Sequence, residues 1–329
     1  MAINLLALTP NVVSRDLSGY ITLLYGPAKI GKTTFASKMP KPLLLAFEAG
    51  YHAIPGIVAQ DVTTWGEMKQ VMRELKKPEV QNTYSSIVVD TVDIAAELCQ
   101  KYVCTQLGIE NIGDGGWGTN GWSKYKKEFE ETFRSLAMMG YAIVFISHDK
   151  EKTITPKQGK EYQQIGSSMQ SSALSIIENM CDIIGYAHNK VNLETGVSRR
   201  VLTLRSDDDS IRCGGRFANI KSEIDFSYEA LTKALCDAID SEAAEHDNKY
   251  VTNEANRPVI ETTYDYDAEM ANFQDMVGQL MSADQGNAIK IQTVVNKYLG
   301  KNKKVSDTTP DQAEFIYLIN KEIKEDLIG

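Results

Sequence analysis

The stretch Gly26-Pro-Ala-Lys-Ile-Gly-Lys-Thr33 fits the pattern G-x-x-x-x-G-K-[ST] at every fixed position. An apolar run over residues 20–25 precedes it and Thr34-Phe-Ala-Ser-Lys38 follows it. The loop is therefore expected to join a strand to a helix, which is the context that this pattern requires. Its glycines allow successive backbone N–H groups to converge on one concavity, and the following helix N-terminus adds positive potential. The sequence predicts a site for the phosphates of a nucleoside triphosphate.

Each part of this loop has an expected task. Lys32 is predicted to reach the β- and γ-phosphates and the Thr33 hydroxyl to bind Mg²⁺, so ATP and Mg²⁺ are the expected cofactors. The residues predicted to surround the nucleotide are Gly26, Pro27, Ala28, Lys29, Ile30, Gly31, Lys32, Thr33 and Thr34.

A second acidic position supports the same site. Residues 86–90 read Ser-Ile-Val-Val-Asp, an apolar run that ends in an aspartate, which is the Walker B pattern. Asp90 is therefore predicted to hold the water shell of Mg²⁺ opposite Thr33, and with Lys32 it is a catalytic candidate. The alternative is that Asp90 only caps the next helix.

The rest of the first 240 residues indicates an α/β fold. Residues 42–47, 86–90 and 141–147 are near-continuous apolar runs, which is typical of parallel strands buried on both faces. Stretches with helical periodicity separate them. A strand over residues 182–188 and the second arm of a hairpin over residues 199–205 predict an antiparallel extension at one sheet edge.

The C-terminal part differs in composition. Residues 241–265 are acidic and irregular, which predicts a linker, and residues 266–329 show helical periodicity, which predicts a small helical domain. Residues 241–329 contain 16 acidic and 9 basic residues, so they carry most of the formal net charge of −9. The preceding domain, residues 1–240, is close to neutral, and any nucleic-acid binding there must come from a local patch.

The five cysteines show no C-x-x-C pair and no neighbouring histidine at metal-ligand spacing, which favours a reduced, cytosolic chain. The apolar start lacks a basic region, and no apolar run reaches about 18 residues. We therefore expect neither a signal peptide nor a membrane span.

The order of these motifs resembles the core of the RecA-like ATPases. It runs from the phosphate loop through Leu-Ala-Phe-Glu48 and Val-Val-Asp90 to Phe-Ile-Ser-His148. Within that group the chain resembles phage AAA-family nucleotide-binding proteins related to single-strand-annealing recombinases, over residues 18–237. The resemblance implies a RecA-like P-loop NTPase core with a mostly parallel sheet, an antiparallel edge extension and a small C-terminal helical domain. It also implies ATP hydrolysis in the cytoplasm of a phage-infected or lysogenic bacterial host.

The resemblance also suggests roles for individual residues. Glu48 stands where the family has a glutamate that polarises the attacking water, although Phe47 replaces the aspartate that commonly precedes it. Glu48 is thus the candidate general base, with a solvated turn residue as the alternative. His148 occupies the place of a polar sensor residue, often glutamine, and could instead be structural. Arg216 is a candidate arginine finger toward a neighbouring subunit, with a surface salt bridge as the favoured alternative.

A polar segment after His148 is the candidate contact for single-stranded DNA. It shows no clear periodicity and is expected to be a mobile loop, and the alternative is a solvated surface. Lysines can neutralise phosphates while an aromatic ring stacks on a base. The candidate residues are Lys150, Lys152, Lys157, Lys160 and Tyr162, with Trp117 and Trp122 of a glycine-rich loop as a second contact and Lys301, Lys303 and Lys304 as the next candidates.

The leading hypothesis is an ATP-hydrolysing recombination or annealing protein that acts on single-stranded DNA as a homo-oligomeric ring or filament. A single-strand-binding protein or a replication partner is a further expected contact. One alternative is an ATP-switched replication accessory or loader protein. Another is a P-loop small-molecule kinase, which is disfavoured because no lid of clustered arginines is visible.

Overall fold

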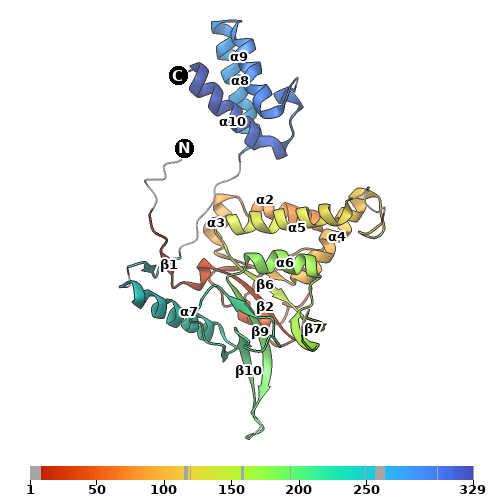
Figure 1. Cartoon of the computed structure of the whole chain (residues 1–329), viewed down its shortest axis with the longest axis vertical. Coiled ribbons are helices and arrows are strands. Elements are labelled where there is room, and N and C mark those ends of the chain that lie inside the picture. Colours follow the sequence, from red (N-terminus) through yellow and green to blue (C-terminus); the bar gives the residue numbers. More distant parts are fainter. Residues whose placement is uncertain are drawn as a thin grey trace. The chain divides into compact units, whose positions relative to one another are not determined.

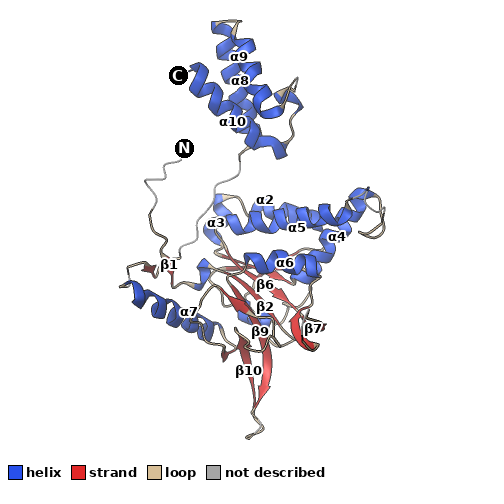
Figure 2. Cartoon of the chain, in the orientation of Figure 1, coloured by secondary structure: helices blue, strands red, loops and turns tan. Residues whose placement is uncertain are grey.

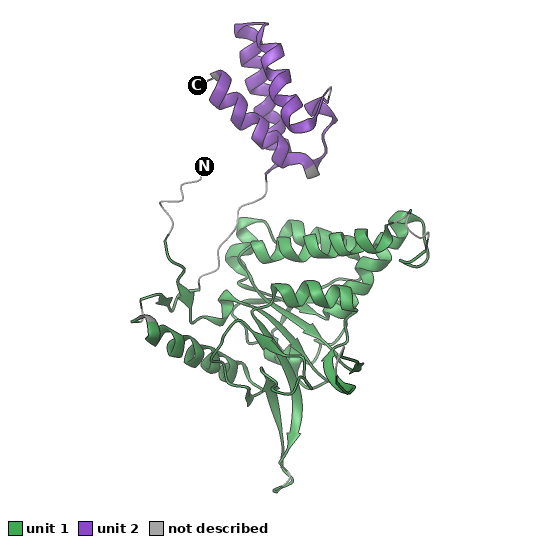
Figure 3. Ribbon diagram, in the orientation of Figure 1, with its two compact units in different colours: residues 1–260 green, residues 261–329 purple. Residues whose placement is uncertain are grey.

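The computed structural model contains two compact units, residues 1–260 and 261–329 (Figure 3). Each unit has its own apolar core and is described separately. The structure describes residues 9–114, 118, 120–156, 159–192, 194–247, 249–255, 264–301 and 303–328.

The first unit is built on a central sheet whose core is parallel (Figure 1). Six parallel strands lie side by side in the order β9-β2-β6-β5-β3-β4. Their bounds are β2 Ile21–Tyr25, β3 Pro42–Ala46, β4 Val58–Asp61, β5 Ser86–Asp90, β6 Ala142–Ser147 and β9 Ile183–Val191. The strand that precedes the phosphate loop is thus separated from the strand that ends in Asp90 by β6 alone. This arrangement confirms the predicted RecA-like core.

The predicted antiparallel extension is also confirmed. Beyond β9 the sheet continues through β10 (Ser198–Thr203) and β12 (Glu223–Asp225), and both pairings are antiparallel. The short β11 (Gly214–Gly215) pairs antiparallel with the start of β9.

Helices cover both faces of this sheet (Figure 2). One apolar cluster joins the sheet to α2 (Trp65–Glu74), α4 (Val92–Leu107), α5 (Gly121–Met138) and α6 (Ser171–Met180). The other joins the opposite face to α1 (Lys32–Ala36) and α7 (Tyr228–Ala243). All residues of β2, β5 and β6 are buried, which explains why these strands read as unbroken apolar runs.

An edge strand, a short helix and a buried residue are among the features of the first unit that the sequence does not predict. The edge strand β4 is mostly exposed and reads Val-Ala-Gln-Asp, so it lacks an apolar pattern. The short helix α3 (Pro78–Thr83) has no buried residue. Ile112, which belongs to the glycine-rich stretch of the sequence before α5, is buried in the core.

Two expectations about irregular segments were wrong. The polar segment after His148 is a β-hairpin, in which β7 (Asp149–Ile154) pairs antiparallel with β8 (Tyr162–Ser167). The connection between β7 and β8 is longer than the two-residue turns by which β-hairpins are recognised in a sequence. The expected linker begins inside the first unit, because α7 reaches Ala243 and β13 (Val251–Thr252) pairs in parallel with β1 (Val13–Ser14).

The second unit consists of α8 (Tyr266–Ala283), α9 (Asn287–Leu299) and α10 (Ala313–Ile323), followed by a π-helical turn (Lys324–Ile328). Ile316, Ile319 and Ile323 of α10 are fully buried in its core. The helical periodicity of residues 273–299 is divided between α8 and α9. No helix among the described residues of either unit is long and apolar enough to cross a membrane.

Candidate nucleotide site

The phosphate loop occupies the carboxyl end of β2, and its backbone requires glycine at positions 26 and 31 for different reasons. A Cβ atom on Gly26 would lie 2.2 Å from the carbonyl oxygen of Ala187. Gly31 caps α1 with φ 109°, a left-handed conformation that strains residues other than glycine. The loop conformation therefore depends on the two glycines that define the motif.

Thr33 at the start of α1 and Asp90 at the end of β5 meet because β2, which leads into the phosphate loop, and β5 end at nearly the same level of the sheet. Residue 25 of β2 pairs with residue 147 of β6, and Asp90 of β5 pairs with Ile146. The Thr33 hydroxyl then donates a hydrogen bond to Asp90 Oδ2 over 2.6 Å. The structure thus brings together the two residues predicted to hold Mg²⁺.

Lys32 and Asp90 are both buried, with side chains 6% and 4% exposed. Lys32 Nζ donates to the carbonyl oxygens of Gly26 and Pro27 at 2.7 and 2.9 Å, and no described carboxylate forms an ion pair with it. Burial lowers the pKa of Lys32 and raises the pKa of Asp90, because each charged form has lost hydration.

These two buried groups fit the expected cofactors. Phosphate oxygens would supply the anionic partner that Lys32 lacks, and a divalent cation would favour the ionised form of Asp90. The residues that would hold Mg²⁺ are Thr33 and Asp90, and the rest of its ligands would come from phosphates and water.

Glu48 and His148 face each other beside this pair. The amides of Phe47 and Glu48 donate to the carbonyl of Asp90 at 2.7 and 3.3 Å, so the turn after β3 is held against the end of β5. Glu48 Oε2 lies 3.6 Å from His148 Nε2, and both side chains are about one-third exposed. A carboxylate and an imidazole are thus placed next to Asp90, open to solvent.

A comparison with family models matches residues 18–212 to the family described as "AAA domain". The chain belongs to this AAA domain family. With its loop geometry, this membership makes the chain a nucleotide-binding protein of the P-loop class.

Two individual proteins are similar to this AAA domain protein. The SPbeta prophage-derived uncharacterized protein YorG of Bacillus subtilis (strain 168) is 27% identical over 329 residues, which is 99% of each chain. The crystal structure of the KaiC-like protein PH0186 from Pyrococcus horikoshii OT3 shares 14% identity at a TM-score of 0.34, over 60% of this chain and 83% of that chain.

Asp93, a carboxylate at the start of α4, is placed differently from Glu48. Its Oδ1 accepts hydrogen bonds from the hydroxyls of Ser147 and Ser168. It thereby ties the start of α4 to the end of β6 and to the residue after β8. Nothing in the sequence indicated this contact, because Ser168 has no motif around it.

The β7–β8 hairpin separates its charges between two faces, because side chains alternate along each strand. Lys150 and Lys152 share one face with Tyr162 on the opposite strand, while Asp149 and Glu151 lie on the other. Lys160 is exposed and precedes β8. Lys157 lies outside the described residues, as does Trp117, while Trp122 is 40% exposed at the start of α5.

Arg216 lies at the amino ends of the parallel strands, whereas the phosphate loop lies at their carboxyl ends. It directly follows β11, which pairs with the first two residues of β9, and its guanidinium lies 3.1 Å from Asp182. The surface salt bridge is therefore present in the structure. A role as an arginine finger would need a second copy of the chain and stays a prediction.

Replacing Asp90 with asparagine is expected to raise the Mg²⁺ concentration required for nucleotide binding about ten- to a hundredfold, since one charge-assisted contact is lost. The amide can still accept the bond from Thr33, so the fold should be kept. Titrating Mg²⁺ against ATP affinity measures the effect. Glu97→Gln, an exposed change on α4, is the control, and equal Mg²⁺ dependence in Asp90→Asn and the parent would contradict the assignment.

Proposed function

We propose that this chain hydrolyses ATP and acts on single-stranded DNA in phage recombination or annealing. The observation that carries the proposal is that the β7–β8 hairpin begins at the residue after His148. A lysine- and tyrosine-bearing strand pair is thus attached directly to the edge of the nucleotide site. The prophage origin in the name of YorG supports a phage setting.

Hydrolysis would use the residues at the carboxyl ends of β2, β3 and β5. Lys32 would neutralise the phosphate chain, and Thr33 with Asp90 would hold Mg²⁺, which supplies charge stabilisation for phosphoryl transfer. Glu48 would orient the attacking water and accept its proton. His148 lies 3.6 Å from Glu48 and would sense whether the terminal phosphate is present.

The hairpin offers the chemistry that a single strand requires. Lys150 and Lys152 can neutralise backbone phosphates, while the ring of Tyr162 on the same face can stack on a base. None of the described lysines of this hairpin is held in an ion pair with a described acid. The root of the hairpin is bonded to the nucleotide site, because the amide of Ser168 donates to the carbonyl of His148 at 2.8 Å.

The test is ATP turnover with and without single-stranded DNA. We expect stimulation by DNA in the parent. We also expect the triple variant Lys152→Ala, Lys157→Ala and Lys160→Ala to bind single strands more weakly, with a flatter salt dependence. Because the binding equilibria of the two ligands are linked, ATP should raise the affinity for DNA by the factor by which DNA raises the affinity for ATP.

A matched control removes three exposed lysines elsewhere in the first unit, Lys76, Lys101 and Lys221. This control should keep the DNA affinity and the salt slope of the parent. If the triple variant of Lys152, Lys157 and Lys160 binds single-stranded DNA as tightly as the parent, the hairpin is not the DNA site. Lys301, Lys303 and Lys304 of the second unit would then be the next candidates.

The separate helical unit favours a second candidate, an ATP-switched loader or replication accessory that uses residues 261–329 to bind a partner protein. Its core is independent of the first unit. Slow turnover that DNA does not stimulate would support this candidate. Formation of ADP only with a small acceptor would instead indicate a kinase.

A further inference from the structure

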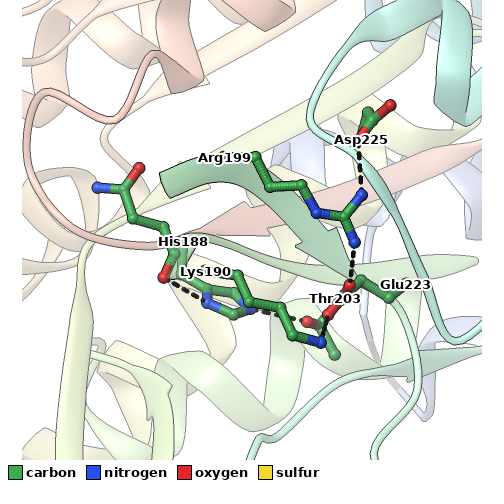
Figure 4. A network of polar contacts seen from close by, with 7 residues as sticks. His188, Lys190, Arg199, Thr203, Glu223 and Asp225 are labelled. Carbon is green, nitrogen blue, oxygen red and sulfur yellow. Dashed lines mark hydrogen bonds and ion pairs between the residues drawn. The ribbon is translucent and has the colours of Figure 1, made fainter. Parts of the chain in front are cut away.

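Two arginines at the start of β10 point to opposite faces of the sheet, because neighbouring residues alternate along a strand. Arg199 donates to Glu223 and Asp225 of β12 at 3.0 and 3.1 Å, and Lys190 of β9 binds the same Glu223 at 2.7 Å. Figure 4 shows this network. The charge of Arg199 is thus compensated by two carboxylates.

Arg200 lies against the phosphate loop. Its Nη1 donates to the carbonyl oxygen of Ile30 at 3.2 Å, and a Cβ atom on Gly31 would lie 3.1 Å from the same nitrogen. No described carboxylate is within ion-pair distance of it. A guanidinium has five N–H donors, so a positive group with donors to spare is held beside a loop built for anions.

The strand that carries Arg200 is fixed to the helix that follows the loop. The carbonyl of Arg200 accepts a bond from the amide of Phe226 at 3.1 Å. The Phe226 ring stacks on Phe35 of α1, with centroids 5.2 Å apart and planes 3° from parallel. The backbone of Arg200 is therefore held in place relative to the loop, and its exposed side chain is bonded to the loop at Ile30.

We propose that Arg200 is a further nucleotide-binding residue that contacts the phosphate chain from the outer side of the loop, within the same chain. Lys32 is bonded to Gly26 and Pro27 at the start of the loop, whereas Arg200 approaches at Ile30 and Gly31. The two cations would thus hold the phosphates from two directions. This inference rests on nucleotide binding at the loop.

The test compares binding of ADP and of ATP with Mg²⁺ to the parent, Arg200→Ala, Arg200→Lys and Arg199→Ala. We expect Arg200→Ala to weaken both nucleotides by the same factor, about ten- to a hundredfold, because one charge-assisted contact is lost. The loss should shrink as salt is added. Arg200→Lys should recover part of the affinity, and Arg199→Ala should stay within about twofold of the parent.

Other readouts separate this role from simple bracing of the loop. A brace alone would lower the thermal stability of the nucleotide-free protein and leave the loss of affinity insensitive to salt. That result, or an Arg200→Ala affinity within about twofold of the parent, would overturn the inference. Lys32→Ala distinguishes the failures: if it loses binding while Arg200→Ala does not, only the role of Arg200 is wrong. If the parent protein binds neither nucleotide, the assignment of the nucleotide site itself is wrong.

Discussion

Replacing Lys32 with alanine is expected to abolish nucleotide binding and turnover, with a loss of affinity on the order of a hundredfold or more, because a buried cation that faces the phosphates is removed. Lys32 lies in the phosphate loop and is buried, with only 6% of the residue exposed. Binding of ATP and of ADP, followed by steady-state hydrolysis, measures the effect.

The fold should survive this change. The carbonyls of Gly26 and Pro27 lose a donor, but the cost of burying an ammonium group is removed as well. Lys32→Met provides a second variant that keeps the packing of the aliphatic stem. Lys38→Ala is the control, since Lys38 is an exposed lysine just after α1 and lies outside the phosphate loop. Turnover at the parent rate in Lys32→Ala would refute the site.

Glu48→Gln is expected to keep ATP affinity and to slow hydrolysis by roughly 10²- to 10⁴-fold, the usual contribution of a general base. The amide preserves the shape of the side chain but cannot accept the proton of the attacking water. Glu48 is about one-third exposed beside His148, so the change leaves little core packing to lose. Single-turnover hydrolysis together with an ATP-binding titration separates the two effects.

A loss smaller than about tenfold would identify another base. Asp93 is the first alternative base, although its Oδ1 already accepts hydrogen bonds from Ser147 and Ser168. Glu97, which is exposed on α4, is the second. Asp93→Asn should therefore disturb the root of the β7–β8 hairpin rather than the chemistry. A hydrolysis defect in Asp93→Asn larger than that in Glu48→Gln would reverse these assignments.

Much of the first unit could be predicted from its sequence because the deciding signals are local. The phosphate loop depends on two glycines, and a Cβ on Gly26 would collide with the carbonyl of Ala187. The strands β2, β5 and β6 are buried on both faces, so nearly every position before the acid at the end of β5 is apolar or small. In α2, Thr64 and Glu67 form the capping box that their spacing predicts.

The hairpin after His148 could not be predicted from its own residues. Lysines and acids alternate along β7, and only the pairing with β8 places Lys150 and Lys152 on the face of Tyr162. The segment therefore reads as an irregular polar loop until its partner strand is known. The pairing of β13 with β1 joins residues 251–252 to residues 13–14, and such a distant partner has no local signal.

The sequence by itself determined the phosphate loop, the buried strands and the acid at the end of β5, because each depends on residues that are neighbours along the chain. Only the tertiary structure decided which side chains surround the loop. Arg200 lies 170 positions from Ile30, and adjacent Arg199 turns away to Glu223 and Asp225. Strand order and register set such contacts, and both follow from the packing of the whole sheet rather than from any short stretch of it.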